Sequence, residues 1–236
     1  MTVPISEEQL YSALAQASRA GVLASISREL AHDLKSPIQA LYLFDFEDTG
    51  PEMEQAFRSI VEKMAATIEK VARIYLVRPA GKTGIPFTIP ELIDVVREIS
   101  EVQRSLPKAG VTFVVPAGLP AIDGNVTECQ HALINLIMNA REAAGGNAEA
   151  RVTVTARAVA GGAEIEVRDN GPGIPPERRE SIFEPFTTTR EAGGVRGLGL
   201  PVARWLARKN NGGLRLVAAE PGQTCFVLSL RELGRG

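Results

Sequence analysis

The chain has 236 residues, of which 44% are hydrophobic, and this length and composition are typical of one or two globular domains. Its 26 basic and 28 acidic residues nearly cancel, which excludes a whole-chain electrostatic footprint for nucleic acid or for an anionic membrane surface. No apolar run approaches the roughly 18 residues that span a bilayer, and the N-terminal segment is unlike a signal peptide, so we expect a cytoplasmic protein without membrane contact.

Two amphipathic helices are predicted in the first third of the chain. Apolar residues recur at three- and four-residue steps across residues 23–41 and again across residues 53–75, which is the spacing of one helical face. Gly50 and Pro51 break the pattern, so residues 1–80 should form a helical hairpin. Two helices share too little core to be stable alone. The near-heptad spacing favours a homodimer in which two hairpins pair into a four-helix bundle, although docking on the rest of the chain is an alternative.

A domain boundary is predicted near residue 80, where residues 78–84 read RPAGKTG, typical of a linker. Beyond it, short alternating runs mix with helices. We expect residues 81–236 to form a two-layer α/β sandwich of mostly antiparallel strands, which makes the whole chain α+β in class. The expected strands are residues 87–89, 111–115, 152–155, 165–167, 214–217 and 225–230, and the expected helices are residues 90–105, 126–144 and one beginning near Pro201.

The first helix carries His32 directly before Asp33. The neighbouring Leu30 and Leu34 fall on the apolar stripe, which turns His32 toward the flank of the bundle, where a nucleotide or a partner protein could reach it. Taken by itself, a histidine at this position is an ordinary surface residue.

Two asparagines, Asn135 and Asn139, lie four residues apart in the helix expected at residues 126–144 and therefore share one face. Asn125 and Glu128 form a plausible capping pair at the start of that helix. A carboxamide oxygen is a hard, neutral ligand that suits magnesium already bound by phosphates. Paired asparagines also occur in purely structural roles.

Residues 169–173 read DNGPG and directly follow an expected strand. The Asp169 carboxylate can accept a hydrogen bond from an exocyclic amine, while Gly171 and Gly173 permit close backbone approach to a flat ligand. An ordinary Asn-Gly turn would use the same residues.

Residues 193–200 read GGVRGLGL and open the expected helix in which Pro201 occupies the first turn. Backbone amides at a glycine-rich helix start bind phosphates, aided by the helix dipole. A glycine cluster alone also describes a flexible loop.

Residues 182–186 read IFEPF and precede TTTR. The two phenylalanines either hinge a mobile lid or belong to the core.

The order of these four segments resembles the nucleotide-binding domain shared by histidine kinases, type II topoisomerases, mismatch-repair ATPases and heat-shock chaperones. The Phe-Glu-Pro-Phe segment is similar to the motif of the kinases specifically. Residues 29–37, ELAHDLKSP, resemble the phosphoacceptor motif of sensor histidine kinases. The resemblance covers almost the whole chain.

The resemblance implies a kinase that uses ATP and Mg²⁺ to phosphorylate its own His32. Asn139 would coordinate magnesium, Asn135 would support the phosphates, and Asp169 would bind the adenine amino group. Asp33 would accept the proton on the second imidazole nitrogen and so make the ring a better nucleophile. The backbone that closes on the nucleotide would come from Gly171, Gly173, Gly197, Leu198 and Gly199, and Arg190 and Arg196 would offset phosphate charge.

The resemblance further implies a response-regulator receiver domain as the partner that accepts the phosphoryl group. Ser36 departs from the usual threonine or asparagine, which puts phosphatase activity in doubt. Because at most about 20 residues precede the histidine helix and include no sensor domain, we expect the signal to come from another protein or from further sequence.

Two other interpretations stay open. A non-catalytic phosphotransfer adaptor would keep the hairpin and His32 but would have lost ATP binding, which the retained Asn139 and Asp169 argue against. An ATPase or protein serine kinase of the same superfamily would leave His32 incidental, which the phosphoacceptor motif argues against.

Overall fold

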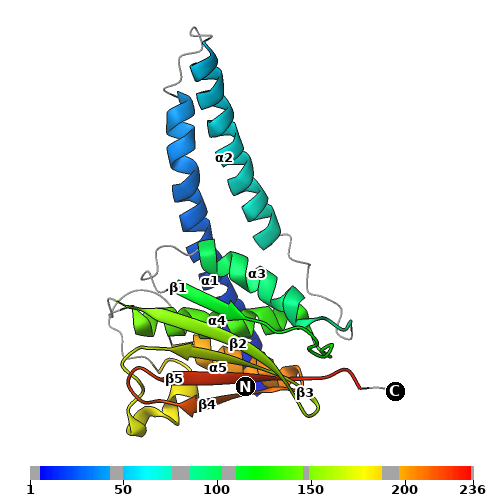
Figure 1. Ribbon diagram of the computed structural model, residues 1–236. Coiled ribbons are helices and arrows are strands. Elements are labelled where there is room, and N and C mark those ends of the chain that lie inside the picture. The colour runs from blue at the N-terminus through cyan, green and yellow to red at the C-terminus, as the bar shows by residue number, and fades with distance from the viewer. Residues whose placement is uncertain are drawn as a thin grey trace, which may run out of the picture.

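The computed structural model describes residues 6–42, 50–75, 85–102, 110–145, 149–187 and 197–234. A helical hairpin projects from an α/β domain (Figure 1). The helices are α1 (Glu7–Tyr42), α2 (Pro51–Tyr75), α3 (Ile89–Val102), α4 (Val126–Ala144) and α5 (Gly199–Lys209), with short 3-10 turns η1 (Pro176–Arg178) and η2 (Ser181–Phe183). The strands are β1 (Gly110–Val114), β2 (Arg151–Val159), β3 (Gly162–Asp169), β4 (Gly213–Ala218) and β5 (Thr224–Arg231). None of the described helices is long and apolar enough to cross a membrane.

The five strands form one sheet in the order β1-β2-β3-β5-β4. The β1–β2 pair is parallel and the other three pairs are antiparallel. Side chains alternate between its faces: Val152 and Val154 are buried under the helices, and the opposite face carries charged pairs such as Arg215 with Glu164. The helices lie on one side of the sheet (Figure 1), so the predicted two-layer α/β sandwich is confirmed. The boundary near residue 80 stays a prediction, since residues 76–84 lie outside the described part.

The strand predicted at residues 87–89 is wrong. Phe87 makes a single bridge with Ile122, and α3 already begins at Ile89. The reason is a capping box: the Thr88 amide donates to a Glu91 carboxylate oxygen at 2.9 Å, and the Glu91 amide donates to the Thr88 hydroxyl at 3.4 Å. This reciprocal pair satisfies amides at the helix start and commits the chain to a helix.

Helix α4 begins at the predicted cap, because the Asn125 side chain accepts from the amides of Thr127 and Glu128. The Glu128 carboxylate turns instead to α5, where it accepts from the Asn210 carboxamide at 2.9 Å. Asn210 in turn accepts from the Asn125 amide at 2.6 Å. These buried bonds fix the start of α4 against the end of α5, and thereby set how the two helices face each other.

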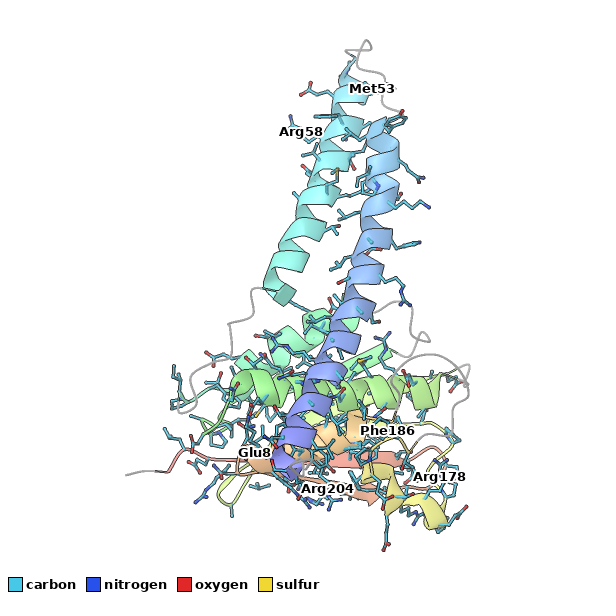
Figure 2. All side chains as sticks on the ribbon, turned by 180° about the vertical axis from the view of Figure 1, so that it is seen from behind. Glu8, Met53, Arg58, Arg178, Phe186 and Arg204 are labelled. Atoms are coloured by element: carbon cyan, nitrogen blue, oxygen red, sulfur yellow. The ribbon has the colours of Figure 1, made fainter. Side chains whose placement is uncertain are left out.

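The N-terminal half of α1 packs on the α/β domain. Leu14 and Val22 in this half of α1 are buried, as are Ile26 and Leu30 in the other half. Tyr11 stacks on Trp205 of α5, with the ring centroids 6.2 Å apart and the planes 14° from parallel. Seen from behind, α1 crosses the domain before it reaches the hairpin (Figure 2). The alternative of docking on the second half therefore describes this part of α1.

Candidate functional site

The asparagine pair on α4 meets the glycine-rich start of α5. Asn139 lies so close to Gly199 that a Cβ atom on that glycine would stand 3.2 Å from the Asn139 amide nitrogen. Gly199 is the first residue of α5, where backbone amides have no partner within the helix. Two motifs about 60 residues apart in sequence are thus brought to one place, a carboxamide beside a helix N-terminus.

Asn135, one turn before Asn139, lies beneath α1. Only 5% of Asn135 is exposed, and its carboxamide oxygen accepts a hydrogen bond from the Ser18 hydroxyl at 3.3 Å. Its amide nitrogen is buried and has no hydrogen-bond partner among the described residues. In this arrangement α1 therefore covers one of the two residues expected at the phosphates.

His131 extends the same face of α4 by another turn and contacts the same serine. Its Nε2 lies 3.2 Å from the Ser18 hydroxyl. Burial, assisted by the nearby Arg19 and opposed by Glu128, lowers the pKa of His131 to about 4. His131 was not among the residues predicted for the site; its position four residues before Asn135, on the same face of the helix, was the available signal.

Asp169 ends β3 and is 3% exposed. Burial raises the pKa of its carboxyl, although hydrogen bonds from the Gly171 amide and the Thr224 side chain work against that rise. The Gly171 bond is 2.9 Å long. A carboxylate offers about four acceptor sites, so these two donors leave capacity for a ligand amine. Thr224 was missed in the sequence, because its contact with Asp169 follows from strand pairing.

The loop after Asp169 closes tightly on its surroundings. A Cβ atom on Gly171 would lie 2.7 Å from an Asp169 oxygen and 2.9 Å from the Ala143 backbone of α4. Gly173 has a φ of 81°, and a side chain there would collide with the Ala219 carbonyl at 2.6 Å. Glycine is required at both positions, so the conformation of this loop depends on these two residues and another turn sequence could not replace them.

The segment expected to be a lid is closed at its base. The Phe186 amide donates to the Gly197 carbonyl at 3.0 Å, so the chain leaves and returns at one point. Phe183 packs edge-on against Phe226 of β5, whereas Phe186 is 64% exposed. Of the two predicted roles, Phe183 therefore has the one in the core, and Phe186 lies at the base of the expected lid. Arg190 and Arg196 lie outside the described residues.

Leu198, between Gly197 and α5, is buried in the core, so it anchors the glycine-rich turn through its side chain. Any contribution of Leu198 to a nucleotide must therefore come from its backbone. Its assignment as a binding residue stays a prediction.

His32 stands apart from these groups. Its imidazole is 84% exposed, and Nδ1 lies 3.8 Å from the nearer Asp33 carboxylate oxygen, which is longer than a hydrogen bond. Ser36, one turn further along α1, is also exposed. The structure therefore places His32 and Asp33 together but does not bring either to the asparagine and glycine cluster.

The chemistry of the donors limits how a metal can bind. No cluster of three histidine, cysteine or acidic side chains occurs in the described part of the chain. The polar side chain beside the start of α5 is the neutral Asn139 carboxamide, which offers one oxygen donor. One neutral oxygen cannot hold a bare divalent ion, but it fits magnesium that arrives already ligated by phosphates.

Residues 124–233 match the family model described as "Histidine kinase-, DNA gyrase B-, and HSP90-like ATPase". The chain is 30% identical over 247 residues to the sensory histidine kinase/phosphatase NtrB of Rhodobacter capsulatus, covering 96% of this chain and 68% of that protein. It is 27% identical over 236 residues to the C4-dicarboxylate transport sensor protein DctB of Rhizobium meliloti, covering 93% of this chain but only 36% of that protein. The chain thus spans about a third to two thirds of the length of these relatives.

Solved structures agree with the sequence relatives. The catalytic domain of the histidine kinase ThkA superposes with a TM-score of 0.55 at 26% identity, covering 63% of this chain and 95% of that one. ThkA in complex with the response regulator protein TrrA matches with a TM-score of 0.53 at 21% identity, covering 98% of this chain and 69% of that one. The second likeness concerns the fold alone.

Proposed function

The chain belongs to the sensor histidine kinase family, and we propose that it binds ATP with Mg²⁺, phosphorylates its own His32 and passes the phosphoryl group to a response-regulator aspartate. One observation carries the proposal: Asn139 meets the start of α5 in the same chain that presents an exposed His32–Asp33 pair.

Each part of the nucleotide has a matching group. Asp169 would accept from the adenine amino group, and Gly171 and Gly173 would hold the loop beside the base, because each packs closely on neighbouring backbone. The amides that open α5 would bind the phosphates. Asn139 would hold Mg²⁺, which when bound neutralises charge on the phosphates.

Phosphoryl transfer to His32 would use the ring nitrogen that faces away from Asp33. Nδ1 is the nitrogen nearer to Asp33, so Nε2 is left as the nucleophile. As the Nε2–phosphorus bond forms, the bond from the γ-phosphorus to its bridging oxygen breaks and ADP leaves. Asp33, after closing from 3.8 Å to hydrogen-bond distance, would stabilise the proton on Nδ1.

The exposure of His32 supports a change of arrangement before transfer. With 84% of its side chain open, the imidazole is accessible both to a nucleotide site and to a partner protein. Transfer therefore requires the ATP site of this chain, or that of a second copy, to approach the hairpin. Homodimerisation through the hairpin is part of the proposal and is supported by exposed apolar side chains on both helices, Ile38, Phe57 and Val61.

A response-regulator receiver domain is the proposed acceptor. Support comes from ThkA, which was solved with the response regulator protein TrrA. For the reverse phosphatase step, Ser36 supplies a hydroxyl one turn after His32, which would orient a hydrolytic water less rigidly than a carboxamide. We propose that the phosphatase activity is weak.

The decisive experiment is incubation with γ-labelled ATP and Mg²⁺. We expect a base-stable, acid-labile label that is lost in His32→Ala and kept in His131→Gln, which changes the only other histidine. Absence of nucleotide binding would instead support the adaptor alternative, and an acid-stable label would support the ATPase or serine kinase alternative. Phosphatase activity is measured separately, by the rate at which the chain removes phosphate from a phosphorylated receiver domain.

A further inference from the structure

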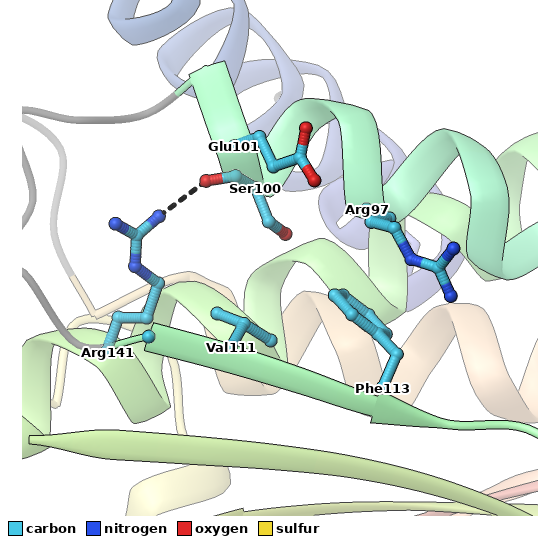
Figure 3. A pocket seen from close by; sticks show the side chains of 7 residues that line it. Arg97, Ser100, Glu101, Val111, Phe113 and Arg141 are labelled. Carbon is cyan, nitrogen blue, oxygen red and sulfur yellow. Dashed lines mark hydrogen bonds between the residues drawn. The ribbon is translucent and has the colours of Figure 1, made fainter.

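A cavity of about 380 Å³ opens between the end of α3, the strand β1 and α4. Figure 3 shows Arg141 of α4 on one side, Arg97 and Glu101 of α3 above, and Val111 and Phe113 of β1 as the floor. The volume is within the range of sites for small organic ligands. Neither nucleotide binding nor phosphoryl transfer uses any of these residues.

Arg141 is a buried cation with too few partners. It is 6% exposed, and its one hydrogen bond to a described residue runs from Nη1 to the Ser100 carbonyl oxygen at 2.8 Å. Its Nε is buried without an acceptor, and no carboxylate pairs with it among the described residues. Burial lowers the pKa of its guanidinium accordingly. An unpaired buried charge is costly, so an arginine retained here is best explained by an anion that completes it.

This cavity is separate from the nucleotide site. Arg141 follows Asn139 by two residues, which turns its side chain by about 200° around α4. Asn139 faces the start of α5, whereas Arg141 reaches the end of α3. The two side chains therefore leave α4 on opposite flanks, and a ligand bound to one would not occupy the other.

The lining also sets the charge and shape of the ligand. Arg97 lies over the Phe113 ring, 5.2 Å from its centroid, which places a second cation at the apolar floor. Arg97 already has a carboxylate partner, Asp94, at 3.9 Å, so Arg141 is the lining cation that has no such partner among the described residues, and Glu101 adds one negative charge. A single negative charge on the ligand matches Arg141, whereas a phosphate dianion or a polyphosphate would be repelled by Glu101.

We propose that this cavity binds a small monoanionic carboxylate with an apolar group. The planar guanidinium of Arg141 matches a carboxylate in shape and hydrogen bonding. The apolar group of the ligand would lie on Val111 and Phe113. The site goes beyond the proposed kinase function and does not depend on it.

Benzoate is a suitable probe, with benzamide as its neutral counterpart, and titration of the full chain by calorimetry or by NMR measures binding. We expect saturable binding of benzoate, at least tenfold weaker binding of benzamide, and a loss of about tenfold or more in Arg141→Gln. Arg58→Gln, on the distant helix α2, is the matched control and should bind as the parent does. Glu101→Gln should bind about two- to fivefold tighter.

Two further measurements keep the proposal falsifiable. If Arg141→Gln fails to fold, Val111→Trp keeps the charge and fills the cavity, and it should abolish binding. Added ATP should leave the benzoate affinity unchanged. Competition with ATP, equal binding of benzamide, benzoate binding that survives Val111→Trp, or binding of an acidic peptide without binding of benzoate would each overturn the proposal.

Discussion

Asp169 combines burial with hydrogen bonds from two internal donors, and this combination would suit the proposed binding of an amine. Among the described residues its carboxylate accepts hydrogen bonds from Gly171 and Thr224, and its remaining acceptor capacity would be available to a donor that enters with the ligand. A carboxamide at the same place would present hydrogens on one side, and these would face the hydrogens of the adenine amine.

We therefore expect Asp169→Asn to weaken ATP binding by about 10- to 100-fold, because a buried hydrogen bond to a charged group is lost and a donor is left unpaired. Titration with ATP measures this directly. Asp33→Ala is the informative comparison, since it should slow labelling while keeping the ATP affinity. If the two variants bind ATP equally well, Asp169 does not contact the base. A normal labelling rate in Asp33→Ala would contradict the role of Asp33.

His131 should make stability depend on pH. Its pKa is about 4 when folded and 6.5 as a reference, so between these values the unfolded chain binds a proton that the folded chain does not. The free energy of unfolding should then fall as pH falls from about 6.5 to 4, by up to about 3 kcal/mol. Above pH 6.5 the residue contributes no pH dependence.

Urea unfolding at several pH values tests this, with His131→Gln as the comparison. The pH dependence of the free energy of unfolding should differ between parent and variant only below about pH 6.5. Parallel curves across the whole range would show that His131 titrates normally. Arg19 and Glu128 remain in both proteins, so their charges cancel in the comparison.

Among the elements, α1 has the least predictable packing. Its apolar stripe requires a partner, but α2, a second hairpin and the α/β domain all satisfy an apolar stripe equally well. What selects the domain for residues 11–18 is shape and polar contact, above all the stacking of Tyr11 on Trp205 and the bonds of Ser18. Such contacts join residues more than 100 positions apart and leave no periodic signal.

Leu14→Ala should loosen this docking, whereas Leu10→Ala should not. The two leucines lie one turn apart on α1, but Leu14 is 8% exposed and Leu10 is 44% exposed. Loss of the buried side chain should cost about 2–3 kcal/mol, and loss of the exposed one well under 1 kcal/mol. Faster amide hydrogen exchange on the face of α4 that carries His131 reports the change. Equal effects of the two variants would mean that α1 does not dock there.

Elements with strong local signals were predictable. Helix α4 runs from Val126 to Ala144 as predicted, because a cap and a continuous apolar period agree. The hairpin of β2 and β3 was predicted too, although both strands are longer than expected. The error at residues 87–89 came from β-branched and aromatic residues that read as a strand, whereas Thr88 within this segment forms a capping box with Glu91 and starts a helix.

On the scale of the whole molecule, the four motif segments (the asparagine pair, DNGPG, IFEPF and the glycine-rich segment) follow one another along the chain. They nevertheless come from different layers of the domain. Their types and order could be read from the sequence, since each has its own glycine or asparagine pattern. The contact of α1 with Asn135 could not be read from the sequence, because it depends on how the hairpin and the domain meet.

The hairpin should carry the dimer contact. Val61 on α2 is 44% exposed, and Val217 on the edge strand β4 is 52% exposed. We expect Val61→Asp to convert a dimer into a monomer, because it places a charge in an apolar interface, whereas Val217→Asp should leave the dimer intact. Light scattering after gel filtration measures the mass. A monomeric parent, or dissociation by Val217→Asp alone, would contradict the assignment.

Helix α1 belongs both to the helical hairpin and, through its N-terminal part, to the packing of the α/β domain. Its 36 residues make a rod about 54 Å long, anchored at one end to the domain and at the other to α2. Pro37 lies inside it and has no amide to offer the Asp33 carbonyl, so this turn is the weakest in the rod. If the hairpin is twisted, α1 should therefore bend most easily at the turn that contains Pro37. This turn lies directly beside His32. Bending of α1 and the chemistry at the imidazole would then be coupled through this one turn. Amide exchange at residues 34–38 that is no faster than at residues 22–26 would argue against such a hinge.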